Sequence, residues 1–249
     1  MTTLPPTATV ENNVNPYQKL QQRKRKWTPV QTTAGELKAG AEETIFRAMA
    51  MRHMELPVGD FIADALDQVP AASADLLRSN IKDEVNHDLA LGYIANALGV
   101  DETAEAEALR LRNAWQAHPD HTILKALVAE RAIFFVLLPF FRFNGDAGLR
   151  TVSADISRDE QVHVAAHSLV CRELDLVVSP SLDKLRKATI AWVMQPLNAS
   201  PDKYLDKKFW LDASDRLMYE GKAPELSDTK RGRMPAFFEH SNNNLPQYA

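Results

Sequence analysis

The sequence predicts an all-α protein, built as a bundle of long helices that ends in an irregular tail. Three observations lead to this fold class. Apolar residues recur at steps of three and four through most of residues 36–196, and no segment shows the alternating pattern of a β-strand. Glycine is scarce, at 9 residues, and none occurs between Leu149 and Glu220. With 45% hydrophobic residues among 249, the chain is long enough to bury a sizeable core.

A proline separates the first two predicted helices. Helix-forming residues fill 36–66, and Pro70 then interrupts the pattern. Ser73 is suited to cap a second helix, which we expect to run to about Leu98 and to end at Gly99.

The remaining helices are also bounded by turn-forming residues. A shorter amphipathic helix is expected over 102–116, and a proline and an aspartate open the next one, over 119–143. The Asn-Gly-Asp-Ala-Gly sequence at 144–148 predicts a turn. Two further helices are expected over 153–174 and 180–196, the last opened by a Pro-Ser pair.

The two ends of the chain differ from this helical region. We expect a flexible N-terminal extension over 1–33, the bundle over 34–197 and a C-terminal tail over 198–249 that wraps the core or docks a partner. The basic run at 23–26 is interpreted as a solvated arm rather than a nucleic-acid contact. Aromatic residues make a fully disordered tail unfavourable, and they are Tyr204, Phe209, Trp210, Tyr219, Phe237 and Phe238.

Composition excludes several classes of function. The net charge is −4, with basic and acidic residues mixed, which is unlike a polyanion binder, so we expect no nucleic-acid partner. Cys171 is the single cysteine, so internal disulfides and cysteine-rich zinc sites are excluded. No glycine-rich phosphate loop is present. The longest apolar run, 132–141, is too short to span a bilayer, and no signal peptide is recognisable, so we expect a cytoplasmic protein.

Four of the predicted helices carry a glutamate in the middle of the apolar stripe that should face the core. These residues are Glu55, Glu84, Glu130 and Glu160. A buried carboxylate without a partner is costly, so something must compensate for all four. Metal cations are the natural candidate.

Two of these glutamates belong to the same short motif, Asp-Glu-x-x-His, at residues 83–87 and 159–163. A spacing of three residues places the glutamate and the histidine on one face of a helix. The sequence holds only three Asp-Glu pairs, and two of them have histidine at this offset. His87 and His163 therefore join the candidate cluster.

The positions of the glutamates along the helices provide an independent test. In an antiparallel pair, residues equally distant from the connecting turn lie at the same level. Glu55 and Glu84 are each about 15 residues from Pro70, or roughly 22 Å at 1.5 Å per residue. Glu130 and Glu160 are related in the same way to Gly145. All four carboxylates are thus expected in one layer of a four-helix bundle.

With this pattern, the region 36–196 resembles the ferritin-like di-iron carboxylate proteins, whose site uses two glutamates and two Glu-x-x-His helices. The resemblance implies a ferritin-like four-helix bundle with additional helices, and two iron ions, or a manganese–iron pair, as cofactors. The implied metal ligands are Glu55, Glu84, His87, Glu130, Glu160 and His163. Glu84 and Glu160 would bridge the metals, and Asp83 and Asp159 would orient the histidines.

His167 lies one turn after His163 on the same stripe. It is a candidate as a third imidazole ligand, a proton relay or a hydrogen-bonded core residue, and we favour the last role. The helix expected over 119–143 is apolar almost all round, which fits either plain core or the wall of a pocket for an apolar substrate.

The resemblance implies an oxidoreductase that activates O2 to oxidise or oxygenate a small apolar substrate, as a monooxygenase does. Aldehyde-deformylating oxygenases are similar in length and in the motif on the last ligand helix. The implied partners are a ferredoxin or reductase as electron donor and a second copy of the chain in a homodimer.

Three alternatives stay open. An iron-oxidising storage protein shares the ligand set, although such chains are shorter. A ribonucleotide-reductase-like small subunit is compatible with the tail, but its tyrosine usually lies four residues after the first histidine, where this chain has Leu91. The third alternative is a structural module stabilised by metal.

Overall fold

The computed structural model describes residues 15–227, and this part of the chain is helical, as predicted. Within it, β-structure is limited to one isolated bridge between Asn198 and Asp206. The helices are α1 Pro16–Gln21, α2 Glu42–Ala50, α3 Glu55–Ala65, α4 Ala74–Leu98, α5 Glu102–Ala117, α6 Thr122–Ala129, α7 Phe135–Asn144, α8 Ala147–Glu173, α9 Pro180–Val193 and α10 Lys207–Glu220. Short 3-10 segments are η1 Met51–Met54, η2 Ala71–Ser73 and η4 Pro224–Ser227, and η3 Glu130–Phe134 is a π-helical turn.

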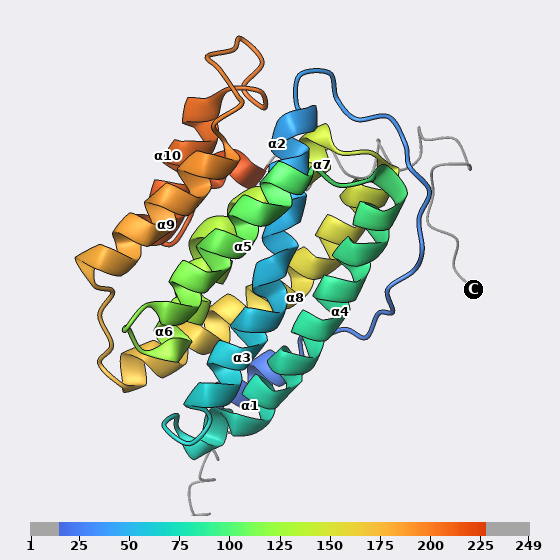
Figure 1. Ribbon diagram of the computed structural model, residues 1–249. Coiled ribbons are helices and arrows are strands. Elements are labelled where there is room, and N and C mark those ends of the chain that lie inside the picture. The colour runs from blue at the N-terminus through green and yellow to red at the C-terminus, as the bar shows by residue number, and fades with distance from the viewer. Residues whose placement is uncertain (1–14, 228–249) are drawn as a thin grey trace, which may run out of the picture.

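Four helical columns enclose the core (Figure 1). The first column is α2, η1 and α3, the second is α4, the third is α6, η3 and α7, and the fourth is α8. α3 packs against α4 and α6, while α8 packs against α4, α6 and α7, so the columns form a closed ring. α5 lies against α2, and α9 and α10 cover η3 from outside.

The first column is less regular than expected. A single helix over 36–66 was predicted, but the α-helix begins at Glu42 and is interrupted by η1 before α3. Pro57 explains the interruption, because proline has no N–H to bond to the carbonyl four residues earlier, at His53. The 3-10 segment precedes this proline, and Glu55 is the first residue of α3.

The third column also departs from a single helix. The helix predicted over 119–143 begins only at Thr122, where the ring of His121 accepts the N–H of Ile123 at 3.3 Å. At Glu130 the winding widens into the π-helical turn η3, and regular α-helix resumes at Phe135. Such turns recur at functional sites, because they redirect the side chains that follow.

α4 and α8 carry the two Asp-Glu-x-x-His motifs. Ser73 does not cap α4 with its side chain; its hydroxyl donates instead to the carbonyl of Pro70 at 2.7 Å. α8 begins six residues earlier than the expected residue 153. Asp146 causes this early start, because its carboxylate accepts the N–H of Leu149 at 2.8 Å and so caps the helix.

The C-terminal region is more regular than the irregular tail that was predicted. Residues 207–220 form α10, which Asp206 caps by accepting the N–H of Phe209 at 3.2 Å. Trp210 is fully buried and meets Phe140 edge-to-face, with ring centroids 5.2 Å apart. Burial of the apolar face of α10 against the third column therefore stabilises this helix. Phe237 and Phe238 lie outside the described residues.

The described part of the predicted N-terminal extension contacts the bundle. α1 packs on α4 and α8, with Tyr17 and Leu20 buried. The Tyr17 hydroxyl donates to Glu173 at 2.7 Å. Within the basic run, Lys24 forms an ion pair with Asp83 instead of remaining in solvent. α1 and Lys24 thus contact the bundle, while Arg23, Arg25 and Lys26 of the basic run are exposed, as expected of a solvated arm.

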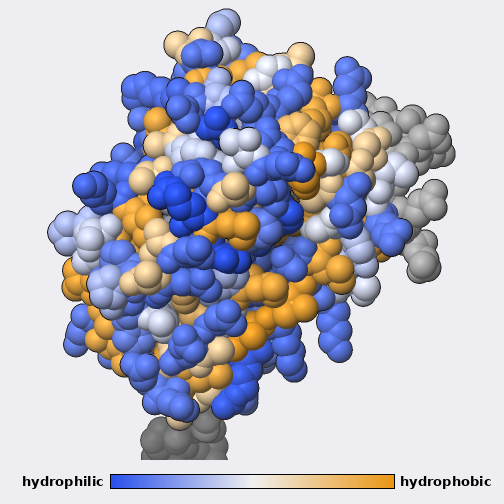
Figure 2. Space-filling model, viewed as in Figure 1, coloured by the Kyte–Doolittle hydropathy of each residue, from blue (hydrophilic) through white to orange (hydrophobic). Residues whose placement is uncertain are grey.

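The outer surface is mixed in polarity. On the face seen in Figure 2, hydrophilic residues surround separate hydrophobic patches. Across residues 15–227, no helix combines the length and the hydrophobicity needed to cross a bilayer.

Candidate metal centre

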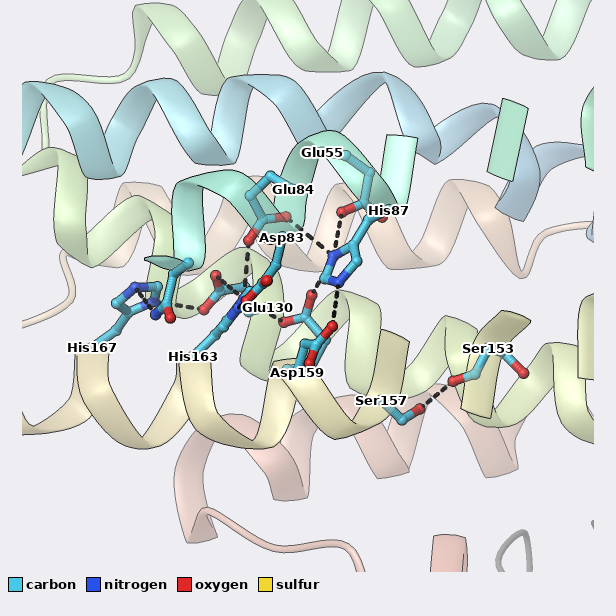
Figure 3. A network of polar contacts seen from close by, with 12 residues as sticks. Glu55, Asp83, Glu84, His87, Glu130, Ser153, Ser157, Asp159, His163 and His167 are labelled. Atoms are coloured by element: carbon cyan, nitrogen blue, oxygen red, sulfur yellow. Dashed lines mark hydrogen bonds and ion pairs between the residues drawn. The ribbon is translucent and has the colours of Figure 1, made fainter. Parts of the chain in front are cut away.

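All six predicted ligand residues meet in the middle of the bundle. Figure 3 shows the side chains of five of them, all but Glu160, converging from α3, α4, η3 and α8. Glu160, on α8, lies in the same cluster. Each of the six is fully buried, and they are Glu55, Glu84, His87, Glu130, Glu160 and His163. The level predicted from the connecting turns is therefore the level at which the carboxylates lie.

The ligand atoms form two overlapping groups, each compact enough to hold a metal ion. The first group is Glu55, Glu84, His87 and Glu160, and the second is Glu84, Glu130 and His163. Within each group, one atom from every residue lies within 4.8 Å of the others. Glu84 belongs to both groups.

Two glutamates face both histidines. The Oε1 atom of Glu84 lies 2.9 Å from Nδ1 of His163, and its Oε2 atom lies 3.4 Å from Nδ1 of His87. Glu160 is arranged in the same way, with Oε1 at 3.3 Å from Nδ1 of His87 and Oε2 at 3.8 Å from Nδ1 of His163. Each carboxylate thus directs one oxygen toward each half of the cluster.

The other two glutamates each face one histidine. Glu55 Oε2 lies 3.5 Å from Nδ1 of His87, and Glu130 Oε1 lies 3.6 Å from Nδ1 of His163. Both glutamates stand at the first position of a segment where the helix changes its winding, α3 and η3 respectively. The irregular columns described above therefore place these two side chains.

The buried atoms of the cluster have few hydrogen-bond partners. Among the described residues, no partner with hydrogen-bond geometry is present for either oxygen of Glu55, Glu84 and Glu160, for Oε1 of Glu130, or for Nδ1 of His87 and His163. Leaving buried polar atoms unpaired costs free energy, and for charged groups the cost is large. A bound cation would satisfy these atoms together, so the residues present fit a metal site.

An aspartate supports each histidine from outside, and the pairing is crossed. Asp83 Oδ2 lies 3.0 Å from Nε2 of His163, although Asp83 belongs to the motif of His87. Asp159 Oδ2 lies 3.4 Å from Nε2 of His87. Since a carboxylate accepts, each imidazole donates its Nε2–H outward and turns Nδ1 toward the cluster.

Two residues of the N-terminal segment extend this arrangement, and the sequence did not identify either. The indole N–H of Trp27 donates to Asp159 Oδ2 at 2.6 Å, and its ring stacks on His87 with centroids 6.1 Å apart. Lys24 forms its ion pair with Asp83. The only sequence signal was a tryptophan in an otherwise polar stretch.

The carboxylates change the protonation of the histidines. Burial by itself lowers the pKa of an imidazole, but here the surrounding acids outweigh it. The pKa of His87 is raised well above its usual value, chiefly through Asp159 and Glu160. The pKa of His163 is raised well above its usual value as well, chiefly through the charge of Glu84 and the contact with Asp83.

The pKa shifts of the carboxylates have different directions. Burial raises the pKa of Glu55 well above its usual value and raises that of Glu160 to about 7. Burial opposes ionisation at Glu84 too, but the charge of the nearby His163 holds the pKa of Glu84 below its usual value. Without a metal, protons on the histidines and on part of the glutamates thus balance the buried negative charge.

His167 is part of the same buried network. Its Nδ1 atom lies 2.6 Å from Glu130 Oε2, and its side chain is fully buried. This contact fits the role of a hydrogen-bonded core residue that we favoured from the sequence. Figure 3 places the ring at one end of the cluster, beside Glu130.

Comparison of the chain with known protein families, with curated proteins and with solved structures finds no match in any of the three.

Proposed function

We propose that this protein is a ferritin-like di-iron carboxylate enzyme that uses O2 to oxidise or oxygenate a small apolar substrate. The observation that carries the proposal is the arrangement of Glu84 and Glu160, each with one oxygen toward His87 and one toward His163. Carboxylates that present one oxygen to each half of a site are suited to bind two metal ions together, whereas a single ion does not require them.

Charge and donor chemistry support a pair of divalent ions. The four glutamates carry four negative charges when ionised, and two divalent cations carry the same number of positive charges. Carboxylate oxygen and imidazole nitrogen suit iron and manganese, so two irons or a manganese–iron pair fit the site. Two ferrous ions held there would supply electrons for the reduction of O2. The protein residues would hold the ions, exclude water and keep the histidines oriented.

A groove on the same helices as the cluster is the proposed site for an apolar substrate. It has a volume of about 570 Å³ and lies between α6 and α8, with Leu127, Phe135, Val164 and Cys171 in its wall. Burial raises the pKa of the Cys171 thiol to about 12, and the charge of Glu130 adds to this effect. Polar side chains, among them Arg131 and Gln161, also line the groove, and none of the six predicted ligands does. The proposed function also includes an electron-donor protein, a homodimeric state and a cytoplasmic location.

Metal content tests the proposal directly. The protein is expressed with iron and manganese present, and the metal bound per chain is measured before and after Glu84→Ala. Because Glu84 belongs to both groups, the variant should lose most of the metal, whereas the exposed Glu36→Ala control should retain two ions. A Glu84→Ala variant that retains two ions would show that the site is wrong.

Reaction with O2 tests the chemistry. The reduced, metal-loaded protein should develop an absorption band of oxidised di-iron on mixing with O2, and apolar aldehydes, amines and lipids should be screened for substrate-dependent O2 consumption. A large cage on size exclusion would favour iron storage, and a stable radical in EPR would favour the reductase-like alternative.

A further inference from the structure

The two glutamates that face a single histidine have different surroundings. Neither oxygen of Glu55 has a hydrogen-bond partner among the described residues. Glu130 has one such oxygen, Oε1, because Oε2 lies 2.6 Å from Nδ1 of His167. Both side chains are fully buried, so water does not explain the difference.

Two further residues, Lys24 and Asn80, determine which atom donates in the hydrogen bond between His167 and Glu130. Lys24 Nζ donates to Oδ1 of Asn80 at 2.9 Å, which turns the amide NH2 of Asn80 toward His167. Asn80 Nδ2 lies 3.5 Å from Nε2 of His167, which accepts. The proton of the neutral imidazole therefore sits on Nδ1, and His167 donates it to Glu130.

The sequence contains the same asymmetry. The second motif ends at His163, and His167 follows four residues later. The first motif ends at His87, and the residue four positions later is Leu91. Leu91 is buried and has no polar atom to donate. The two motifs are otherwise alike, so only the half of the site that contains His163 has an additional imidazole, that of His167.

We propose that His167 is a positioning residue that holds Glu130 as a one-oxygen ligand and thereby makes the two metal positions unequal. This inference rests on the proposed di-metal function. Beside His87, the protein offers one nitrogen, both oxygens of Glu55 and one oxygen each from Glu84 and Glu160. Beside His163, the compact group is Glu84, Glu130 and His163, and Oε2 of Glu130 is engaged with His167. Glu160 approaches this side only through its Oε2 atom, 3.8 Å from Nδ1 of His163. A metal ion beside His163 would therefore have fewer protein ligands and more room for an exchangeable ligand.

Cobalt substitution and azide binding test the inference without any measurement of activity. Co²⁺ absorbs more strongly in the visible region when it has fewer ligands, and azide binds at exchangeable positions. The wild-type protein should bind two Co²⁺ ions in different environments and take up one tightly bound azide per pair.

Two variants separate positioning from simple packing. His167→Leu has a side chain of similar volume and lacks the donor, so Oε2 of Glu130 would become available to a metal ion. We expect weaker Co²⁺ absorption and azide binding reduced roughly tenfold or more. His167→Gln retains an N–H donor and should behave like the wild type.

The outcomes are distinct. If the wild-type protein binds two equivalent Co²⁺ ions and two azides of equal affinity, the inference is wrong, whatever the variants do. If His167→Leu and His167→Gln bind azide equally well, the inference is also wrong. If no metal binds to the wild-type protein, the proposed function itself fails, which is a different result from either of these.

Discussion

In the metal-free protein, Glu160→Gln should stabilise the fold at about pH 8 and have little effect at about pH 5. The reason is that burial raises the pKa of Glu160 from 4.5 to about 7. Between these values the folded protein retains a proton that the unfolded chain has lost, so folding becomes less favourable as the pH rises. Glutamine has nearly the same shape and cannot ionise, so the variant escapes this penalty.

The magnitude follows from the size of the pKa change. Raising a pKa from 4.5 to about 7 in the folded state corresponds to about 3 kcal/mol, because one pKa unit is about 1.4 kcal/mol. For a chain of this length, about 2–4 °C of melting temperature corresponds to each kcal/mol. The variant should therefore melt about 6–12 °C above the wild type at the upper end of the pH range.

The assay is thermal unfolding followed by circular dichroism, on protein stripped of metal with EDTA, at a series of pH values. The raised pKa values of His87 and His163 also make the wild type less stable as the pH rises, because the contribution of the charged imidazoles is lost. The difference between variant and wild type is therefore the quantity to follow. The exposed Glu36→Gln control should show no such trend. A constant difference, or a wild type that is the more stable protein at about pH 8, would refute the reasoning.

Three further predictions concern metal, the N-terminal segment and the outer helices. Mn²⁺ at about 100 times its Kd should add about 2.7 kcal/mol for each occupied position, seen as a higher melting temperature that EDTA reverses. Trp27→Phe removes the donor to the buried Asp159 and should cost about 1.5–3 kcal/mol in urea unfolding; an unchanged midpoint would contradict this. Arg186→Met breaks the contacts of a fully buried guanidinium with Asp183 and Asp215, both at 2.7 Å. It should cost about 2 kcal/mol, since Asp215 stays half exposed, and should leave the metal content unchanged.

The residues of the buried Glu/His cluster could be predicted because they obey a rule of periodicity. Glu84 and His87 lie three apart on one face of a long helix, so their burial follows from the apolar residues around them. The level of Glu55 followed from its distance to the turn, even though the structure divides that helix into two parts. The local sequence pattern and the geometry of helices were sufficient to predict that these side chains converge.

Other parts of the site depend on contacts that no local pattern contains. Trp27 meets Asp159 across 132 positions of the chain, and Lys24 reaches Asn80 from a segment that reads as a solvated arm. The π-helical turn that begins at Glu130 shifts the winding by a fraction of a turn, which leaves the apolar pattern nearly unchanged. Helix α10 was missed because the prolines around it outweighed its amphipathic pattern.

The crossed aspartates have a consequence for how the protein assembles. Residues 42–98 and 122–173 each form a helical pair with one motif, yet His87 relies on Asp159 and Glu160, and His163 relies on Asp83. Neither pair on its own contains a complete metal position. The cluster can form only after the two pairs have docked, so metal uptake during refolding would measure that docking step. A fragment of either pair alone would remain without the ion.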